Sequence, residues 1–239
     1  VFVASRFGMP VSGSHSPIAG VAGSGVAHSG LDVLQGAGLT RILEGLVFSP
    51  ILGFLLAYIV MLIIYWALRR VAPARITAIF SKAQIFTAGW MAFSHGSNDA
   101  QKTMGIITLA LFTFGSIDVL EVPLWVIVVS GVIMGAGTYF GGFRVIRTLG
   151  VRIVTMRPIH GFAAEGAAAG VITMASRLGI PISTTHTITS SILGMGSTRR
   201  LSAVRWGVAR SIVYAWILTF PICALLGAAL YHLINLVAI

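Results

Sequence analysis

Acidic residues are scarce in this 239-residue chain, which has only 6 Asp and Glu against 16 Lys and Arg. Charged residues make up 9% of the sequence, whereas a soluble domain carries about 25%. So few charges cannot cover the surface of a soluble globule. Disorder is also excluded, because 56% of the residues are hydrophobic and the mean hydropathy is +0.94. The composition therefore predicts an integral membrane protein in a lipid bilayer, with an all-α fold.

Cysteine is nearly absent as well, and the single Cys223 excludes an intrachain disulfide. The net charge of +10 does not indicate a nucleic-acid partner, because the Lys and Arg residues form short clusters between apolar runs. The sequence has no convincing zinc-ligand spacing, no Gly-rich nucleotide loop and no nucleophile elbow. We therefore expect neither enzyme activity nor a cofactor.

Long uncharged runs dominate the rest of the chain. A bilayer crossing takes about 20 apolar residues. Three runs are long enough to span without interruption: residues 47–68, 122–142 and 211–237. Two further long segments are interrupted by polar residues, residues 84–115 by SHGSNDAQKT and residues 158–197 by ASRLGIPISTTH.

Basic clusters between these segments predict the orientation. They lie at residues 69–82, 144–157 and 199–210, and the positive-inside tendency places all three in the cytoplasm of a plasma (inner) membrane. The segment 158–197 begins and ends beside such clusters, so it enters the membrane and returns. Its polar break would be costly in lipid but acceptable in a protein-lined cavity. This favours a re-entrant helical hairpin with its tip near mid-membrane over two full crossings.

The chain also matches itself at an offset of 171 residues. The sequence ASRFGMPVS at 4–12 lies over ASRLGIPIS at 175–183, and His15 lies over His186. We interpret this match as a duplication. The charge pattern predicts that the two copies face opposite ways. Inverted repeats whose broken helices meet at mid-membrane are typical of transporters, although channels can be built in the same way.

The two copies differ in what precedes them. The second copy has about 90 residues before its Ala-Ser-Arg, and the first has three. We therefore expect an N-terminally truncated chain, with about 80–100 further residues upstream that carry the partner of the SHGSNDAQKT stretch. The expected parts are the remainder of an N-terminal repeat (1–68), a cytoplasmic basic linker (69–83) and a C-terminal inverted repeat (84–239).

Hydroxyl side chains gather at the expected hairpin tips. Ser183, Thr184 and Thr185 follow Pro181 at a predicted helix start, where free N–H groups and a partial positive charge favour an anion. Ser12 and Ser14 offer a similar set in the other copy. Ordinary helix capping is the alternative for one copy alone, but two inverted copies favour an anion site.

The SHGSNDAQKT stretch is expected to interrupt its helix and to carry a functional carboxylate, because ionisable groups at this depth are costly. Asp99 could coordinate Na⁺, carry a proton or accept a hydrogen bond from a protonated oxyanion. Lys102 could attract an anion or pair with Asp99, and the alternative is a buried, salt-bridged kink. Glu165 is either a second cation or proton site or a group paired inside the bundle. Four further polar residues are expected to lie around the binding groups: His95, Gln101, Lys102 and Thr103.

These motifs resemble those of the inorganic phosphate transporter (PiT) family. Gly96-Ser97-Asn98-Asp99 and Pro181-Ile182-Ser183-Thr184-Thr185-His186 are similar to the C-terminal motifs of that family. The segment 10–15 is similar to the N-terminal motif, with Gly13 and Ser14 in place of two threonines. The resemblance covers essentially the whole chain.

The resemblance implies an inverted-repeat transporter that carries inorganic phosphate together with Na⁺ or H⁺ by alternating access. Asp99 and Glu165 would serve the coupling cation, with no metal expected beyond Na⁺ at Asp99. Three other functions remain open, which are a sulfate permease of the same fold, an anion channel and a non-transporting receptor. Assembly into a homo-oligomer also remains open. The residues implied in phosphate binding are Ser12, Ser14, Asn98, Asp99, Ser183, Thr184 and Thr185.

Overall fold

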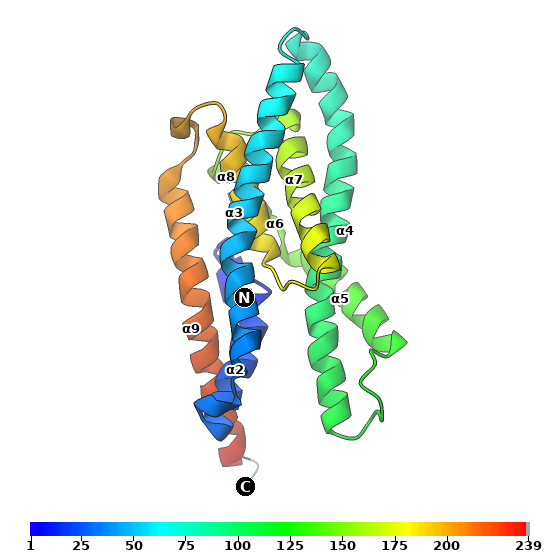
Figure 1. The fold of residues 1–239 in the computed structure, drawn as a ribbon, viewed down its shortest axis with the longest axis vertical. Helices are drawn as coiled ribbons and strands as arrows, with labels where there is room; N and C mark the ends of the chain where they lie inside the picture. The colour runs from blue at the N-terminus through cyan, green and yellow to red at the C-terminus, as the bar shows by residue number, and fades with distance from the viewer. Residues whose placement is uncertain (238–239) are drawn as a thin grey trace.

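The computed structural model describes residues 1–237, of which none forms a strand, and 81% of the chain is helical (Figure 1). Long helices form because apolar residues without water must satisfy their backbone groups internally. Three short helical turns lie at 31–33, 148–152 and 201–203. The α-helices are α1 (Phe2–Arg6), α2 (His15–Ser29), α3 (Gly36–Ala67), α4 (Pro73–Thr113), α5 (Leu124–Gly141), α6 (Phe143–Arg147), α7 (Pro158–Arg177), α8 (Thr184–Ser197) and α9 (Trp206–Val237).

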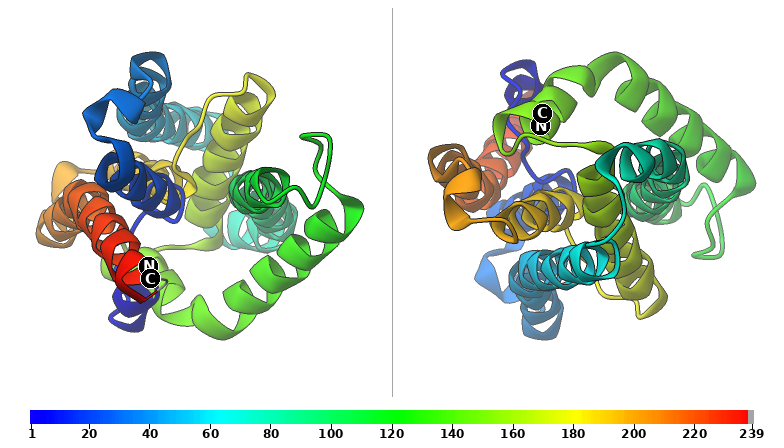
Figure 2. Two further views of the ribbon diagram at one scale, coloured as in Figure 1. Left: turned by 90° about the horizontal axis from the view of Figure 1, so that it is seen from below. Right: turned by 90° about the horizontal axis from the view of Figure 1, so that it is seen from above.

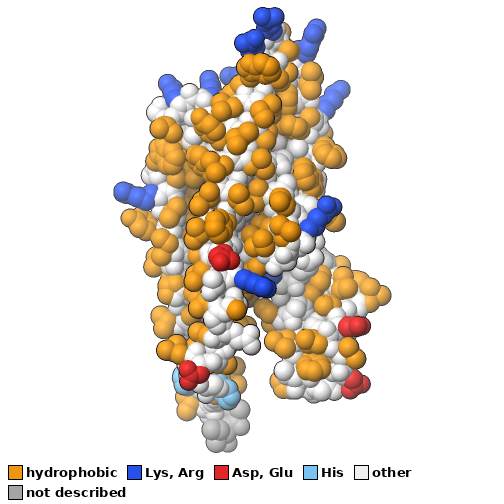
Figure 3. Space-filling model, viewed as in Figure 1, with side chains coloured by type: hydrophobic (Ala, Val, Ile, Leu, Met, Phe, Trp, Pro, Cys, Tyr) orange, Lys and Arg blue, Asp and Glu red, His pale blue; other side chains and the backbone are white. Residues whose placement is uncertain are grey.

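Three of these helices are long and apolar enough to cross a membrane, namely α3, α5 and α9. They coincide with the three uninterrupted runs of the sequence, so the predicted integral membrane class is confirmed. Apolar side chains cover much of the surface, and Lys and Arg gather at its upper end in Figure 3. The α3–α4 and α8–α9 connections lie at that end, and the α4–α5 connection lies at the other (Figure 1).

Helix α4 corrects one prediction. It runs without a break from Pro73 to Thr113, so the polar stretch at 94–103 does not interrupt it. Gly96 inside a helix costs only about 1 kcal/mol relative to Ala. Asn98 and Lys102 bond to Ser176 and Ser14 on other elements, and Ser94 Oγ donates to the carbonyl of Trp90 within the continuing helix. The expected basic linker at 69–83 is also mostly helix, because α4 already begins at Pro73.

Helices α7 and α8 form the predicted re-entrant hairpin. In Figure 1, α7 descends from the upper end, a short non-helical segment turns at mid-height, and α8 returns upward. Ser183 is the N-cap of α8 and its hydroxyl accepts a hydrogen bond from the backbone N–H of His186. The polar break is therefore the tip of a hairpin rather than the connection between two full crossings.

The duplication is visible in the packing. Helix α8 packs along α3, and α2, its counterpart in the first copy, packs along α9. The contact glycines are also matched, since Gly23 lies against the backbone of Ala224 and Gly194 lies against the backbone of Phe54. Without a side chain, each glycine lets two helices approach closely. The hairpin of each copy is thus held by the long helix of the other.

The buried core lies where α7 and α8 pack against α3 and the first turns of α9, with the start of α4 partly buried against it. Small side chains such as Ala163, Ala164 and Ala168 fill the contact face of α7. Helix α5 packs on α4 and lies at the rim of the molecule in the end-on views of Figure 2. The helices that contact the turns of the two hairpins are α3, α4 and α9.

Candidate functional site

Each hairpin has a tip, which is the turn between its two helices together with the start of the helix that follows. The first tip lies between α1 and α2 and the second between α7 and α8, and the two tips meet directly. The Oγ atoms of Ser12 and Ser183, which occupy matched positions in the two copies, lie 2.9 Å apart. Both residues are buried, with exposed fractions of 1% and 0%. The matched imidazoles of His15 and His186 lie beside them, with ring centroids 5.3 Å apart. The pseudo-symmetry of the repeats thus has its centre between the tips, as the inverted-repeat interpretation predicted.

Both tips also bond to one carboxylate on α4. The hydroxyl of Ser14 donates to Oδ1 of Asp99 and the hydroxyl of Thr184 donates to Oδ2, each at 3.1 Å. His95 lies one helical turn before Asp99, and its Nε2 is 3.3 Å from Oδ2. The side chain of Asp99 is only 13% exposed. The carboxylate of Asp99 on α4 is therefore hydrogen-bonded by both tips.

Lys102 completes this polar cluster. Its ammonium lies 3.2 Å from Oδ1 of Asp99, which makes the pairing considered from the sequence an ion pair at i,i+3 without a kink in the helix. The same ammonium donates to Oγ of Ser14 at 2.8 Å, to the side-chain oxygen of Asn98 and to the backbone carbonyl of Ile182 at 3.2 Å. Lys102 thus contacts both tips and α4.

Asn98 connects the cluster to α7. It is 6% exposed, and its Nδ2 donates to Oγ of Ser176 at 2.8 Å. One turn earlier, the hydroxyls of Ser94 and Thr173 lie 3.0 Å apart. These bonds hold the polar face of α4 against the descending arm of the hairpin. They give the continuous helix its external hydrogen-bond partners.

A cavity of about 800 Å³ opens beside the cluster, between α4, α5 and the tips. His95, Asp99 and Thr103 line it from α4, and Thr184 and Thr185 line it from α8. Of the predicted surrounding residues, Gln101 is exposed, does not line this cavity and takes part in none of the cluster's described hydrogen bonds. Carboxylate, hydroxyl and imidazole groups thus face space large enough for a small ion and water.

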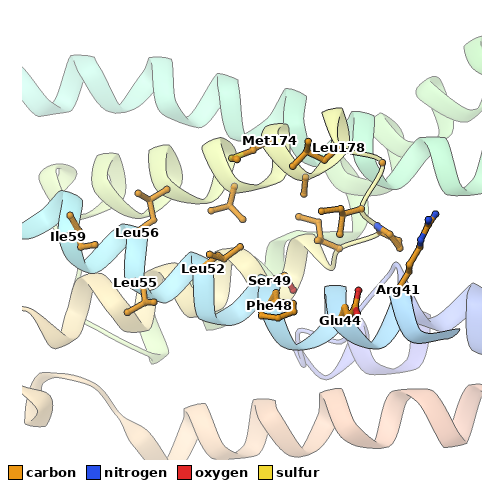
Figure 4. Close-up of a pocket in the computed structure, with 16 residues that line it drawn as sticks. Arg41, Glu44, Phe48, Ser49, Leu52, Leu55, Leu56, Ile59, Met174 and Leu178 are labelled. Carbon is orange, nitrogen blue, oxygen red and sulfur yellow. The ribbon is translucent and has the colours of Figure 1, made fainter. Parts of the chain in front are cut away.

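A second cavity of about 840 Å³ lies next to the second tip, between α3 and α7 (Figure 4). Its walls are mostly apolar, with Leu52 and Leu56 on α3 facing Met174 on α7. Arg41 and Glu44 lie at its end near the tip. None of the predicted site residues lines this cavity.

Glu165 lies apart from the cluster. Its carboxylate accepts hydrogen bonds from Thr87 Oγ1 at 3.1 Å and from Gln84 Nε2 at 3.5 Å. Thr87 precedes Asp99 by twelve residues on α4, a rise of about 18 Å along the helix axis. Glu165 is therefore paired with neutral groups between α4 and α7, and it forms a second polar position rather than part of the first.

Trp216 on α9 is a further residue at the site, and no sequence motif pointed to it. Its Nε1 donates to the backbone carbonyl of Pro10 at 3.0 Å, and its ring stacks on His186 with centroids 3.9 Å apart. It therefore contacts both tips. From the sequence alone, a tryptophan in an apolar run is typical of a packing or interfacial residue, and no local motif distinguishes Trp216 from one.

Comparison with known proteins agrees with this architecture. A family model described as Phosphate transporter family matches residues 1–227. The chain is 43% identical over 233 residues to a probable low-affinity inorganic phosphate transporter of Rhizobium meliloti (strain 1021), covering 97% of this chain and 70% of that protein. It is 39% identical over 232 residues to a protein of the same description from Bacillus subtilis (strain 168), with the same two coverages.

A solved structure has the same fold. It is described as "The sodium-dependent phosphate transporter", and the two chains are 25% identical with a TM-score of 0.85. The likeness covers 98% of this chain and 76% of that one. The arrangement of long helices and re-entrant hairpins is therefore common to both proteins.

Proposed function

Because this chain belongs to the phosphate transporter family, we propose that it is an ion-coupled symporter of inorganic phosphate that works by alternating access. The family consists of transporters, so the chain is not expected to be an enzyme. The coupling cation is Na⁺ or H⁺, and Na⁺ is supported by the structural neighbour, which is described as sodium-dependent. Phosphate binds where the two hairpin tips meet.

The observation that carries this proposal is the contact between Ser12 and Ser183. Two hydroxyls from opposite repeats lie within hydrogen-bond distance of each other, and each can turn to donate to an anion bound beside the pair. Ser14 and Thr184 add hydroxyls next to them, and the N-terminus of α8 adds a partial positive charge. Thr185 and Asn98 complete the proposed half-site.

Charge explains why a cation must accompany the anion. A phosphate dianion in a site enclosed by protein is costly unless positive charge balances it. Asp99 on α4 and Glu165 on α7, whose carboxylate bonds to Gln84 and Thr87 of α4, are the groups proposed to serve the coupling cation. Occupancy by both ions permits the repeats to move against each other and to open the site to the opposite side.

The test is uptake of radiolabelled phosphate into proteoliposomes that contain the full-length protein. We expect uptake above the equilibrium level when an inward Na⁺ or H⁺ gradient is imposed, and none without a gradient. Flux that only follows the phosphate gradient would indicate a channel, and binding without flux would indicate a receptor. Stronger competition by sulfate than by unlabelled phosphate would identify a sulfate permease of this fold. Each of these three results would contradict the proposal.

A single substitution tests the role of the shared carboxylate. Asp99→Asn keeps the size of the side chain but removes the charge that Ser14, Thr184 and Lys102 contact. We expect this variant to lose gradient-driven uptake while it remains folded. Unchanged coupled uptake would remove Asp99 from the transport cycle.

A further inference from the structure

The ammonium of Lys102 occupies a cage of four oxygens. These are Ser14 Oγ, Asn98 Oδ1, Asp99 Oδ1 and the backbone carbonyl of Ile182. An ammonium has only three N–H donors, so four oxygen neighbours are more than it can bond individually. A carboxylate, an amide oxygen, a hydroxyl and a carbonyl are the donors that hard cations take in proteins. The cage is therefore built for a positive charge rather than for a particular hydrogen-bond pattern.

The cage is closed from several sides. Asn98 and Asp99 come from α4, Ser14 from the first tip and Ile182 from the second tip. The side chain of Lys102 is only 17% exposed, and that of Asp99 only 13%. A buried carboxylate among buried oxygens needs a cation beside it, because an uncompensated charge in such a place is strongly unfavourable. Lys102 supplies that cation from the next turn of the same helix.

A free Na⁺ that used these four oxygens would have to take the position of the ammonium itself. The cage cannot hold both, since two positive charges would then share one carboxylate at close range. The residues around Asp99 therefore do not fit an exchangeable Na⁺ while Lys102 is in place. Glu165 differs in this respect, because its described partners, Gln84 and Thr87, are neutral.

We propose that Lys102 is the fixed cation of the Asp99 site, and that it makes this site independent of Na⁺. This inference rests on the proposed phosphate transport and refines it. The positive charge beside Asp99 is thus attached to the chain rather than taken from solution. It remains at the junction of the two tips through the cycle, next to the hydroxyls proposed to bind phosphate.

The experiment measures exchange of phosphate for phosphate by full-length variants that all carry Glu165→Gln, so that a cation at Glu165 does not contribute. Exchange is compared in Na⁺ and in choline at constant pH and ionic strength. Lys102→Met removes the charge, Lys102→Arg keeps it, and Lys82→Met is the matched control because Lys82 is the other lysine of α4 and is exposed. We expect exchange by the Glu165→Gln parent, and by the parent with Lys102→Arg or Lys82→Met, to be the same in both salts. Exchange by the parent with Lys102→Met should fall about tenfold in choline, the effect of losing one contact to a charged group, and recover in Na⁺.

A second measurement does not depend on transport. Binding of Na⁺ to the vacated cage should raise the Tm of purified Lys102→Met by several degrees over its value in choline, because a ligand that binds only the folded state stabilises it. The Glu165→Gln parent should show no such rise. A Glu165→Gln parent stabilised or stimulated severalfold by Na⁺, or a folded Lys102→Met derivative that responds to Na⁺ in neither measurement, would overturn the proposal. Absence of gradient-driven uptake by the wild type would instead refute phosphate symport, while the Tm comparison would still decide the role of Lys102.

Discussion

Gly194 offers a sharp test of how the hairpins are held. It lies on α8 where that helix meets α3, and a Cβ added there would overlap the backbone carbonyl of Phe54. A backbone atom in a long helix cannot rotate away as the end of a side chain can. Overpacking of this kind costs up to about 3 kcal/mol, and the better helix propensity of Ala returns about 1 kcal/mol. We therefore expect Gly194→Ala to lower the free energy of unfolding by about 2 kcal/mol.

For a chain of this size the loss corresponds to a Tm lower by about 4–8 °C. Thermal unfolding of the purified protein in detergent, followed by tryptophan fluorescence, measures it. Gly131→Ala on α5 is the matched control, since no heavy atom lies within 4 Å of its added Cβ. Its Tm should stay level or rise. Equal Tm values for the two variants would refute the close approach of α8 to α3.

Two further predictions concern the polar groups. Ser12→Ala and Ser183→Ala each remove one hydroxyl of the central pair, and each should raise the KM for phosphate about tenfold. The concentration dependence of phosphate uptake measures the KM. An unchanged KM in both variants would exclude the pair from the binding site. Glu165→Gln keeps a hydrogen-bonding side chain between Gln84 and Thr87 but removes its charge. It should lose gradient-driven uptake yet retain exchange of phosphate for phosphate, and uptake that still follows the cation gradient would exclude Glu165 from coupling.

The repeat made most of the fold predictable. A match at 171 residues requires two similar structures, and the charge pattern requires that they face opposite ways. Together these facts predict that Ser12 and Ser183 meet, although they are far apart in the sequence. No propensity argument could have brought them together.

Helix α4 shows where local reasoning failed. Residues such as Ser94, Asn98 and Asp99 disfavour a helix interior when their side chains compete for nearby backbone. In the folded protein Asn98 and Asp99 have partners on other elements, so the competition disappears and the helix continues. The identity of those partners, including Ser176 on α7, depends on the packing of α4 against the hairpin. That packing is not encoded in the local sequence.

The repeats are not equivalent at the centre, and this difference bears on alternating access. The positions matched by the 171-residue offset are Gly45 on α3 and Trp216 on α9. Gly45 lies with its backbone against the carbonyl of Pro181 at the second tip, whereas Trp216 donates a hydrogen bond to the matched carbonyl of Pro10 at the first tip. The same carbonyl is thus contacted in each copy, once by packing alone and once by a hydrogen bond.

If the tips exchange roles during transport, this inequality biases one facing state over the other. A neutral hydrogen bond contributes about 1 kcal/mol, which corresponds to a population ratio of about fivefold. Trp216→Phe keeps an aromatic ring but removes the donor, so it should shift the ratio of the two states by about that factor. The rate at which a membrane-impermeant maleimide labels Thr185→Cys in a Cys223→Ser background measures the shift, because Thr185 lines the cavity beside the tips. Equal labelling rates with and without the indole N–H would mean that Trp216 holds the first tip equally in both states, and the bias would then have to arise elsewhere.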